Sequence, residues 1–374
     1  MNQPAPKPFH MALFIPSLVG GGAERITINL ARGLIEAGVK TDIVVGQAEG
    51  PYLKDVPKQA RLVNLKASRT ITALWPLSRY LRKERPDGMI SALDHANVVA
   101  LLAVAISRTK TPTVVATHVH LSSARKHQAF WWAYLARFLQ RLTYPWARSI
   151  VAVSHGVAAD MAELFGWPVS GIRVIYNPVI DQDLLAKARR PALHKWLTKR
   201  DRPVIVAIGR LTEEKDFPML LHAIALLRER SAARLIILGE GEERGKLQQL
   251  VAELRLQDIV DMPGFATNPY SYLFGASVVA LSSRGEALPT VLIEALACGV
   301  PVVSTDCPVG PNEVLANGKY GRLVPVGDAS AMALALLDAL KGASPPPVAS
   351  WQPYTVEKAT REYLGLFESQ GVVG

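Results

Sequence analysis

The sequence predicts an α/β protein made of two doubly wound domains. At 374 residues, the chain exceeds the size at which a single hydrophobic core usually stops growing. Short apolar runs alternate with stretches of helical periodicity, which indicates parallel sheets covered on both faces by helices. The alternation stops at Asn177-Pro178, a pair that breaks regular structure, and then restarts. We therefore expect two Rossmann-like domains, at 1–178 and 179–350, followed by a helical segment at 351–374.

The first half begins with an apolar run over 9–17, a glycine turn at 20–22 and a helix in which Ile26, Leu30 and Leu34 recur at helical spacing. Further strands are expected at 41–45, 88–91, 113–116 and 150–153, with helices at 74–84 and 130–142. Doubly wound sheets bind ligands at the carboxyl ends of their strands. We therefore expect the ligand in a cleft that faces those ends of both sheets.

The second half repeats the pattern. Strands are expected at 204–208, 234–238, 278–281 and 301–304, with helices between them. A loop follows at 343–347, and residues 354–368 have the periodicity of a helix.

Composition narrows the class of protein. Apolar content of 49% and charged content of 20% are typical of a globular protein. Cys298 and Cys307 have no metal-site spacing, which fits a reducing cytosol. We see no signal peptide, and the longest apolar run, 98–106, is far shorter than the roughly 20 residues that span a bilayer. We expect a cytoplasmic protein, with peripheral attachment to the inner face of the membrane as a further expectation.

The formal charge of +10 is unevenly distributed. Residues 1–178 contain 21 Lys and Arg against 10 Asp and Glu, and no acidic residue lies between Asp94 and Asp160. Segment 125–148 interleaves five Lys and Arg with seven aromatic residues, a composition that suits an anionic membrane surface. The alternative is an amphipathic helix with a core-facing aromatic side. Nucleic acid favours the same composition, but we do not expect it as a partner.

Two glutamates flank a predicted helix start in 284–303. Pro289 suits the first helical position and Gly299 suits the residue just past the helix end, so Glu286 lies in a loop and Glu294 about one turn inside the helix. The N–H groups at a helix N-terminus are a ready site for phosphate. The alternative is two surface carboxylates on an ordinary helix.

This segment resembles the Glu-x7-Glu signature of retaining glycosyltransferases of family 4, which have the two-domain GT-B fold. The resemblance implies that Glu286 lies by the donor sugar, that Glu294 binds the nucleotide ribose, and that the C-terminal helix crosses back to the first domain. Many members have Gly-Phe-Gly where this chain has Ala287 and Leu288-Pro289. Because Pro289 has no N–H, phosphate contacts are expected from Leu288, Thr290 or Val291.

Residues 209–215 match the family pattern Gly-Arg-Leu-x3-Lys, in which the cations contact the donor diphosphate. The resemblance implies that role for Arg210 and Lys215, and preplaced cations would stabilise the departing nucleotide. The Gly239-x-Gly241 turn is expected to be mainly structural. Gly264-Phe265 resembles the segment that meets the nucleotide base, although a plain turn is an equal alternative.

In the first half, a glycine loop lets the backbone approach a ligand closely. The resemblance implies that Gly21 and Gly22 face the donor phosphate, and that Gly20 and Glu24 face the acceptor. Three histidines follow strands. We expect His118 beside the donor sugar, with His120 as a competitor on the same face and on the acceptor side, and His155 also on the acceptor side.

The Asp181-Gln182-Asp183 triplet has the form of a metal motif in glycosyltransferases of another fold. Its place after the Asn-Pro hinge favours a helix cap instead. We expect no metal and no cofactor, with Arg210 and Lys215 neutralising the diphosphate.

The resemblance implies a retaining, metal-independent hexosyltransferase. We expect a UDP-sugar as the donor, with GDP-mannose as the alternative, because no residue of this sequence decides the base. The segment Gly310 to Glu313 resembles the same segment in the family branch that builds cell-surface and lipid-linked glycans. This resemblance implies a glycan or lipid-linked acceptor. Two other functions are alternatives. A sugar-nucleotide epimerase of the same fold needs carboxylates in the first domain, where Asp94 is one of few, and a silent nucleotide-sugar or glycan binding protein would need to lack a key residue.

Overall fold

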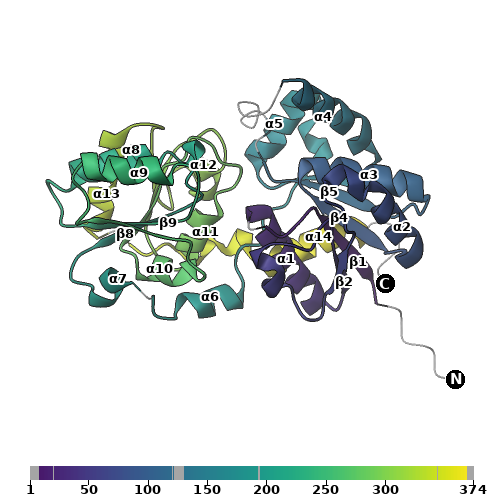
Figure 1. Cartoon of the computed structure of the whole chain (residues 1–374), viewed down its shortest axis with the longest axis horizontal. Coiled ribbons are helices and arrows are strands. Elements are labelled where there is room, and N and C mark those ends of the chain that lie inside the picture. The colour runs from purple at the N-terminus through teal and green to yellow at the C-terminus, as the bar shows by residue number, and fades with distance from the viewer. Residues whose placement is uncertain are drawn as a thin grey trace. The chain divides into compact units, whose positions relative to one another are not determined.

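The computed structural model describes residues 8–368 apart from 20, 120, 122–129, 193 and 343, and it leaves the side chains of 130–133 undescribed. The chain divides into two compact units, Met1–Pro178 with Val356–Gly374, and Val179–Thr355. Each unit is a parallel sheet with helices packed on it (Figure 1). This arrangement confirms the predicted α/β class with two Rossmann-like parts.

The first unit has a seven-stranded sheet in the order β3-β2-β1-β4-β5-β6-β7, with every pair parallel. Its strands are β1 (His10–Ile15), β2 (Lys40–Val45), β3 (Arg61–Asn64), β4 (Gly88–Ala92), β5 (Thr113–Thr117), β6 (Ser149–Ala152) and β7 (Ile172–Val174). Its helices include α1 (Gly22–Glu36), α2 (Leu74–Glu84), α3 (Asp94–Ser107), α4 (Phe130–Thr143) and α5 (His155–Phe165). The strand order reverses between β1 and β4, which makes the loops after these two strands the expected ligand site.

The central strands β1, β4 and β5 are buried at every position. A parallel strand covered by helices on both faces has no solvent side, so it is apolar throughout. This burial explains why these strands are visible in the sequence as continuous apolar runs.

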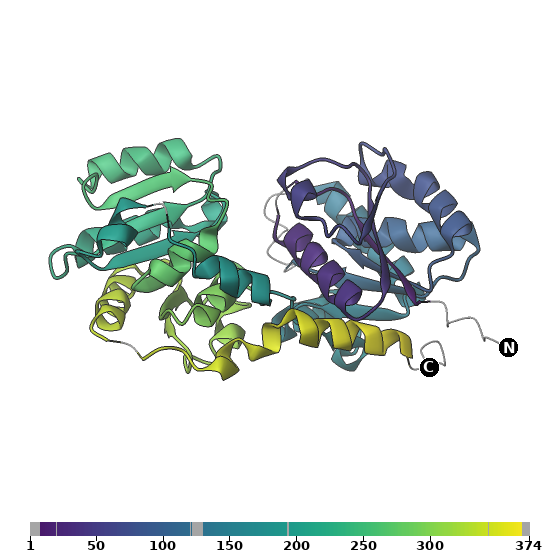
Figure 2. The same cartoon turned by 90° about the horizontal axis from the view of Figure 1, so that it is seen from below.

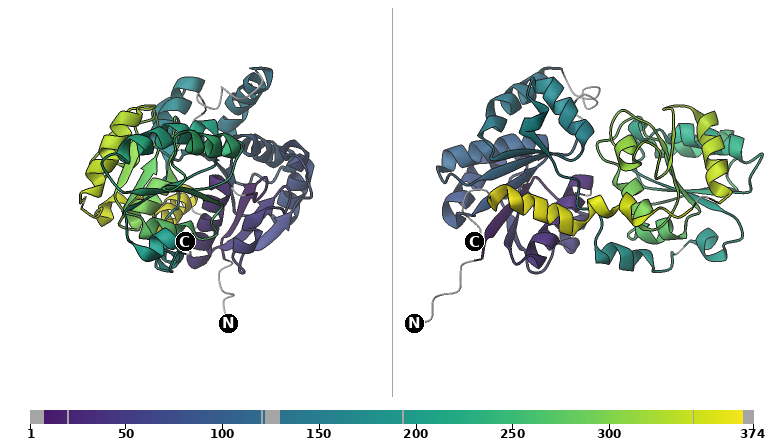
Figure 3. Two further views of the ribbon diagram at one scale, coloured as in Figure 1. Left: turned by 60° about the vertical axis from the view of Figure 1, so that its left-hand side comes forward. Right: turned by 180° about the vertical axis from the view of Figure 1, so that it is seen from behind.

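The last helix, α14 (Val356–Glu368), belongs to the first unit, as predicted. It packs on α1, and a Cβ placed on Gly33 would lie only 2.1 Å from Thr360 Oγ1. The rings of Phe9 and Phe367 lie 6.0 Å apart, and Arg148 Nε donates to the carbonyl of Leu366 at 2.6 Å. Figures 2 and 3 show α14, in yellow, lying along this unit. The helix begins two residues later than predicted, because 352–354 form a 3-10 turn.

The second unit has a six-stranded parallel sheet in the order β10-β9-β8-β11-β12-β13. Its strands are β8 (Val204–Ile208), β9 (Arg234–Leu238), β10 (Val260–Gly264), β11 (Val278–Leu281), β12 (Val302–Thr305) and β13 (Arg322–Val324). Its helices are α6 (Gln182–Ala188), α7 (Lys195–Lys199), α8 (Phe217–Leu227), α9 (Arg244–Glu253), α10 (Pro269–Gly275), α11 (Thr290–Ala297), α12 (Pro311–Val314) and α13 (Ala329–Leu340). Here the order reverses between β8 and β11.

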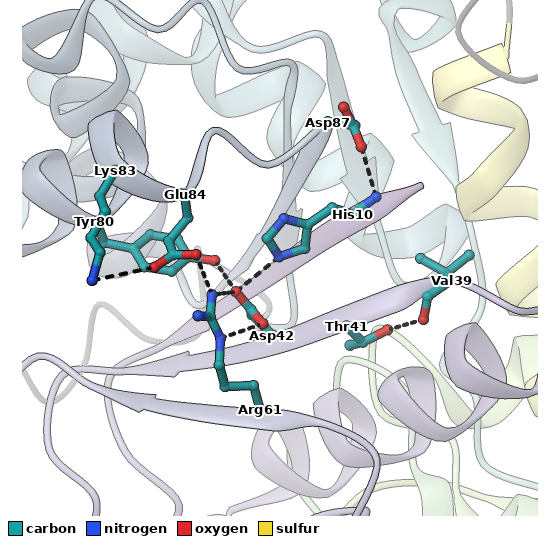
Figure 4. A network of polar contacts seen from close by, with 9 residues as sticks. All are labelled: His10, Val39, Thr41, Asp42, Arg61, Tyr80, Lys83, Glu84 and Asp87. Carbon is teal, nitrogen blue, oxygen red and sulfur yellow. Dashed lines mark hydrogen bonds and ion pairs between the residues drawn. The ribbon is translucent and has the colours of Figure 1, made fainter. Parts of the chain in front are cut away.

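A charged network is buried in the first unit (Figure 4). Asp42 on β2 has no exposed surface, and its carboxylate accepts from Tyr80 Oη at 2.6 Å and from Arg61 Nε at 2.9 Å. His10 Nε2 lies 2.9 Å from the same carboxylate, and Arg61 also pairs with Glu84 at 2.9 Å. Burial alone would raise the pKa of Asp42, but these partners outweigh it and hold the pKa well below its usual range.

Candidate functional site

An ion pair spans the switch point of the second unit. Lys215 lies in the loop after β8, and Glu286 lies in the loop after β11, the neighbouring strand. Lys215 Nζ donates to Glu286 Oε1 at 2.5 Å, and Ser283 Oγ donates to the same oxygen at 2.6 Å. Among the described residues, both side-chain hydrogen bonds to Glu286 end on Oε1. The side chain of Glu286 is 11% exposed.

Backbone and side-chain bonds hold the two loops together. Arg284 N donates to the carbonyl of Glu214 at 2.8 Å, and Ser282 Oγ donates to the carbonyl of Lys215 at 2.7 Å. Thr305 Oγ1, on β12, donates to the carbonyl of Ser283 at 2.6 Å. The charged pair is thus fixed by the fold before any ligand arrives, a condition for electrostatic catalysis.

Asp216 anchors the end of the first loop. It adopts a left-handed conformation with φ of 45°, caps α8 by accepting from Met219 N at 3.4 Å, and accepts from Arg284 Nε at 2.8 Å. Asp216 is buried, whereas the Lys215 side chain before it is 21% exposed. The loop therefore presents Lys215 at the surface from a fixed backbone.

Arg210 supplies a second cation in the same loop. Its side chain is exposed and makes no hydrogen bond or ion pair with another described residue. The backbone beneath it is held by a bond from Leu211 N to the carbonyl of Glu240 at 2.9 Å. The guanidinium is therefore free to bind an anion at the surface.

The Gly239-x-Gly241 turn packs against the loop that contains Arg210. A Cβ on Gly239 would lie 1.9 Å from the carbonyl oxygen of Gly209, and one on Gly241 would lie 2.3 Å from that of Leu211. Gly239 also has φ of 145°, a value that side chains disfavour. These close approaches show why glycine occupies both positions, and they support the structural role expected of the turn.

We predict that Gly239→Ala destabilises the second unit by at least about 2 kcal/mol, because the backbone clash forces the two loops apart. Thermal unfolding of the purified variant measures the loss. Gly245→Ala is the matched control, because a Cβ there meets nothing within 4 Å inside α9 and should stabilise by about 0.5–1 kcal/mol. Equal unfolding temperatures for the two variants would contradict the role given to Gly239.

The helix after Glu286 starts later than predicted. Pro289 has φ of −74° and ψ of 93° and forms the N-cap of α11, so it is not the first helical residue. The physical reason is the extended ψ of Pro289, which lies outside the helical range. The Pro289 ring also packs closely on Gly310, where a Cβ would lie 2.7 Å from Pro289 Cδ. Leu288 is buried, while Thr290 and Val291 are partly exposed in the first turn. Glu294 is buried one turn inside α11, as predicted.

The two cysteines are poor nucleophiles. Burial, together with the nearby carboxylate of Glu294, raises the pKa of Cys298 to about 12. Burial and the carboxylate of Glu286 raise the pKa of Cys307 to about 12 as well. A thiol must lose its proton to attack carbon or bind metal. Neither cysteine has the environment of a reactive thiol.

An exposed aromatic ring follows β10. Gly264 ends this strand with φ of 91° and accepts a bond from Gly239 N at 3.0 Å. Phe265, the next residue, is 61% exposed. An exposed ring at the carboxyl end of a strand suits stacking on a nucleotide base. The base contact that the family pattern implies for Phe265 stays a prediction, and the structure also has the plain turn that was its alternative.

The glycine loop of the first unit leads into α1. Gly21 is the N-cap, and a Cβ there would lie 2.2 Å from Glu24 Oε2, so Glu24 folds back over the loop. Gly22 has open space around it, and Arg25 donates to Tyr52 Oη at 3.0 Å. Gly20 lies outside the described residues. The loop is open at Gly22, where a ligand could approach the backbone.

His118 directly follows β5, at the carboxyl edge of the first sheet. Burial lowers its pKa to about 4, against the opposing effect of a hydrogen bond with Asn177. The imidazole is therefore neutral at pH 7. His155 is the first residue of α5, with an exposed side chain whose ring lies 6.2 Å from that of Tyr176. His120 lies outside the described residues.

Asp94 begins α3, and the family pattern did not single it out. Its Oδ1 accepts from Thr117 Oγ1 at 3.0 Å and from Tyr144 Oη at 3.2 Å, and burial raises its pKa to about 6. Leu93, before it, has φ of 79°, a strained value for a branched side chain. In the sequence, Asp94 is an acidic residue two positions after the buried strand β4.

The Asp181 triplet caps a helix, as predicted. Leu184 N donates to Asp181 Oδ1 at 2.6 Å at the start of α6, and Asp183 pairs with Lys187 at 2.7 Å. Both carboxylates thus have local structural partners.

The described part of 125–148 carries an apolar surface. Tyr144 is fully buried, but five large apolar side chains are exposed. They are Tyr134, Leu135, Phe138, Leu142 and Trp146. The alternative in which the aromatic residues of this segment form core thus holds for Tyr144 and fails for Tyr134, Phe138 and Trp146. The structure does not describe residues 125 and 126 or the side chains of 130–132.

Two family models match the chain, one to each half. The model described as Glycosyltransferase Family 4 matches residues 20–183, and the model described as Glycosyl transferases group 1 matches residues 189–353. The chain belongs to glycosyltransferase family 4. The resemblance drawn from Glu286 and Lys215 is therefore confirmed at the level of the family.

Two bacterial relatives match most of the chain. A Campylobacter jejuni enzyme named as an N-acetylgalactosaminyltransferase acting on a diphospho-undecaprenol-linked sugar is 28% identical, with 86% of this chain and 87% of the relative covered. The lipopolysaccharide core biosynthesis glycosyltransferase LpsE of Rhizobium meliloti is 29% identical, with 84% of each covered. Both relatives are named as glycosyltransferases.

Solved structures share the fold. Anabaena HepE, crystallised with UDP and glucose, superposes with a TM-score of 0.77 at 20% identity, covering 96% of this chain and 98% of HepE. TarM of S. aureus superposes with a TM-score of 0.76 at 14% identity, covering 96% and 100%. Within the described ranges, no helix is both long and apolar enough to cross a bilayer.

Proposed function

We propose that this glycosyltransferase moves a sugar from a UDP-sugar to a hydroxyl of a glycan or lipid-linked acceptor, with retention of anomeric configuration and without a metal. The observation that carries the proposal is the Lys215–Glu286 pair, fixed across the switch point of the second sheet with its cation partly exposed. The exposed Arg210 adds a second positive charge in the same loop.

These groups have the chemistry that sugar transfer needs. The acceptor hydroxyl attacks the anomeric carbon on the face that the nucleotide leaves, the bond to the diphosphate breaks, and the proton passes to the departing phosphate oxygen. Arg210 and Lys215 stabilise the negative charge that builds on the diphosphate. Glu286 binds sugar hydroxyls through Oε2, Glu294 takes the ribose, and the neutral His118 lies beside the donor sugar. No side chain is required as a nucleophile or metal ligand.

The choice of UDP is supported by the structures with which this chain shares its fold. HepE was crystallised with UDP and with UDP-glucose, and TarM with UDP. GDP-mannose is the alternative donor. Incubation with UDP-glucose, UDP-GlcNAc, UDP-galactose and GDP-mannose, with release of nucleotide as the measurement, separates them. Release from GDP-mannose alone would overturn the choice of UDP, and release from none would overturn the proposed use of these donors.

A lipid-linked acceptor is supported by the Campylobacter relative, whose name specifies a diphospho-undecaprenol carrier. Such an acceptor places the enzyme at the inner face of a membrane. The exposed apolar side chains of α4 and the basic residues between them suit that location, because rings and alkyl groups insert at the headgroup level while cations meet anionic lipid.

We predict that Phe138→Ser/Leu142→Ser reduces binding to anionic vesicles at least tenfold, because two exposed apolar side chains lose their burial in the lipid, each worth about 1.5–3 kcal/mol when complete. Flotation with phosphatidylglycerol vesicles at physiological salt measures the change. Leu334→Ser on α13, also an exposed apolar residue, is the control and should bind as the wild type does. Equal flotation of both variants and the wild type would remove the membrane from the proposal.

The two alternative functions, an epimerase and a silent binding protein, have less support. The match of both halves to glycosyltransferase models argues against an epimerase, and Asp94 is held by Thr117 and Tyr144. A silent binding protein would require the loss of a charged site residue, whereas Arg210, Lys215, Glu286 and Glu294 are all present.

A further inference from the structure

The Asn177-Pro178 pair carries a buried side-chain amide at the point where the chain leaves the first unit. Along the sequence, the pair marks only a break in regular structure. In the structure, Asn177 is 7% exposed, and a buried amide is destabilising unless it is hydrogen-bonded. Its side chain forms a hydrogen bond with His118, the residue that directly follows β5. The end of this part of the first unit is thereby tied to a histidine of the candidate site.

His118 lies at the switch point of the first sheet. It lines a small cavity whose other walls come from β1, β4, β5, α1 and α14. The lining is apolar apart from Thr27, His118 and Tyr363, and the cavity volume of about 20 Å³ is room for about one water molecule. The cavity is therefore too small to hold a sugar, and it gives the imidazole an apolar surrounding that favours the neutral ring.

The bond with Asn177 selects one form of that neutral ring. A neutral imidazole has one N–H donor and one nitrogen that accepts, and the hydrogen bond made by one nitrogen decides which is which. The bond raises the pKa of His118 against the larger effect of burial, so it favours the protonated ring, as an amide oxygen that accepts from a ring N–H does. The ring N–H therefore points at Asn177 Oδ1, and the other ring nitrogen is an acceptor.

The backbone on both sides of Asn177 is fixed. Ile175 N donates to the carbonyl of Ala152 on β6 at 3.1 Å, which holds the segment before Asn177 beside the sheet. The buried Asn29 on α1 donates through Nδ2 to the carbonyl of Pro178 at 2.9 Å, which holds the segment after it. A residue before proline is also restricted to extended conformations. The amide of Asn177 therefore meets His118 from a backbone that is ordered before any ligand binds.

We infer that Asn177 is a positioning residue for His118, which it holds in the tautomer whose second nitrogen accepts a hydrogen bond from a hydroxyl of the donor sugar. The inference rests on the proposed function, which puts His118 beside that sugar. Sugar hydroxyls donate readily to an imidazole lone pair, whereas a ring free to change tautomer would present an N–H to the sugar part of the time. A ring oriented in advance makes this contact without further ordering.

Proton–nitrogen correlation NMR of the histidine rings tests the tautomer directly, with the full chain and UDP at pH 7. His118→Ala identifies the His118 signals. In the wild type, one ring nitrogen of His118 is expected to have the chemical shift of a protonated nitrogen and the other that of an unprotonated one. In Asn177→Ala, both shifts should move toward the average of the two tautomers. Asn29→Ala is the matched control, because it removes another buried amide that bonds to the same pair, and it should keep the wild-type shifts.

Hydrolysis of the UDP-sugar that the wild type uses best tests the consequence for the reaction. Asn177→Ala should lower kcat about fivefold, which corresponds to one hydrogen bond of about 1 kcal/mol, and it should leave the affinity for UDP unchanged because UDP has no donor sugar. In a His118→Ala background the same substitution should change kcat less than about twofold, because its effect acts through the ring. Asn177→Asp keeps the shape and the acceptor oxygen, so it should keep the single tautomer at pH 8 even if Asn177→Ala fails to fold.

Two tautomers of His118 in the wild type would overturn the inference, as would a single tautomer that survives in Asn177→Ala or is lost in Asn177→Asp. An equal loss of kcat with and without His118, or a loss in Asn29→Ala as large as that in Asn177→Ala, would show that the pair matters only for the structure. The NMR result does not depend on turnover. A wild type that hydrolyses no UDP-sugar therefore counts against the proposed function, whereas normal turnover with mixed tautomers counts against this inference alone.

Discussion

Lys215→Ala is expected to lower kcat for sugar transfer about 10²- to 10³-fold, the usual loss when one group that stabilises transition-state charge is removed. Lys215 Nζ lies 2.5 Å from Glu286 Oε1, and the loop that carries it is bonded to the Glu286 loop. Removal of the amine takes a positive charge from the diphosphate and leaves Glu286 without its counter-ion. Steady-state release of UDP measures the effect.

Lys246→Ala is the matched control for this result. Lys246 pairs with Glu243 at 2.7 Å, but its side chain is 77% exposed, and exposed pairs contribute about 0–1 kcal/mol to stability. The control should retain the wild-type kcat. Glu286→Gln should lose activity just as Lys215→Ala does. The circular dichroism spectra of both single variants should remain those of the wild type. Near-normal turnover in both variants would contradict the assignment of this pair to the reaction.

Asp42→Asn is expected to destabilise the first unit by about 3 kcal/mol, since it removes the buried carboxylate on which the buried His10 and Tyr80 and the half-exposed Arg61 converge. Asp42 is fully buried with His10, Arg61 and Tyr80 around its carboxylate. Amide exchange in peptides from β1, β2 and β3 should become about 10²-fold faster at pH 7. Glu357→Gln, which breaks the exposed pair with Arg361 on α14, is the control and should change exchange little.

The pH dependence of this effect has a definite sign. Because the folded pKa of Asp42 lies below its unfolded value of about 3.9, its stabilisation is complete above that value. It is lost as the pH falls below about 4 toward the folded pKa. The difference in stability between wild type and Asp42→Asn should therefore be constant from pH 6 to pH 8 and shrink below pH 4. A difference that grows in acid would contradict the role of the carboxylate.

Most of the fold could be predicted because its central strands are buried on both faces. The sequence alone located β8, β9 and β11 at their observed bounds. The sheet edges were missed for the opposite reason. Strand β3 is mostly exposed and begins at Arg61, and β7 and β13 have three residues each, so none forms an apolar run. Short edge strands depend on their neighbours more than on their own composition.

The candidate site was predictable where it depends on local chemistry. Glu286, Glu294 and the helix end at Gly299 could be placed from a single segment. The Lys215–Glu286 contact joins residues 71 apart, and only the adjacency of β8 and β11 creates it. Spacing along the chain carries no information about such contacts until the strand order is known.

Time-resolved proton NMR of donor hydrolysis measures whether the enzyme uses a UDP-sugar with retention and without a metal. The wild type is mixed with UDP-glucose, UDP-GlcNAc or UDP-galactose in buffer containing EDTA, and the anomeric signal of the released sugar is followed before mutarotation. We expect the α-anomer of the sugar to appear first with at least one donor. Lys215→Ala should release this anomer about 10²-fold more slowly. First appearance of the β-anomer, or release only after a divalent cation is added, would contradict it.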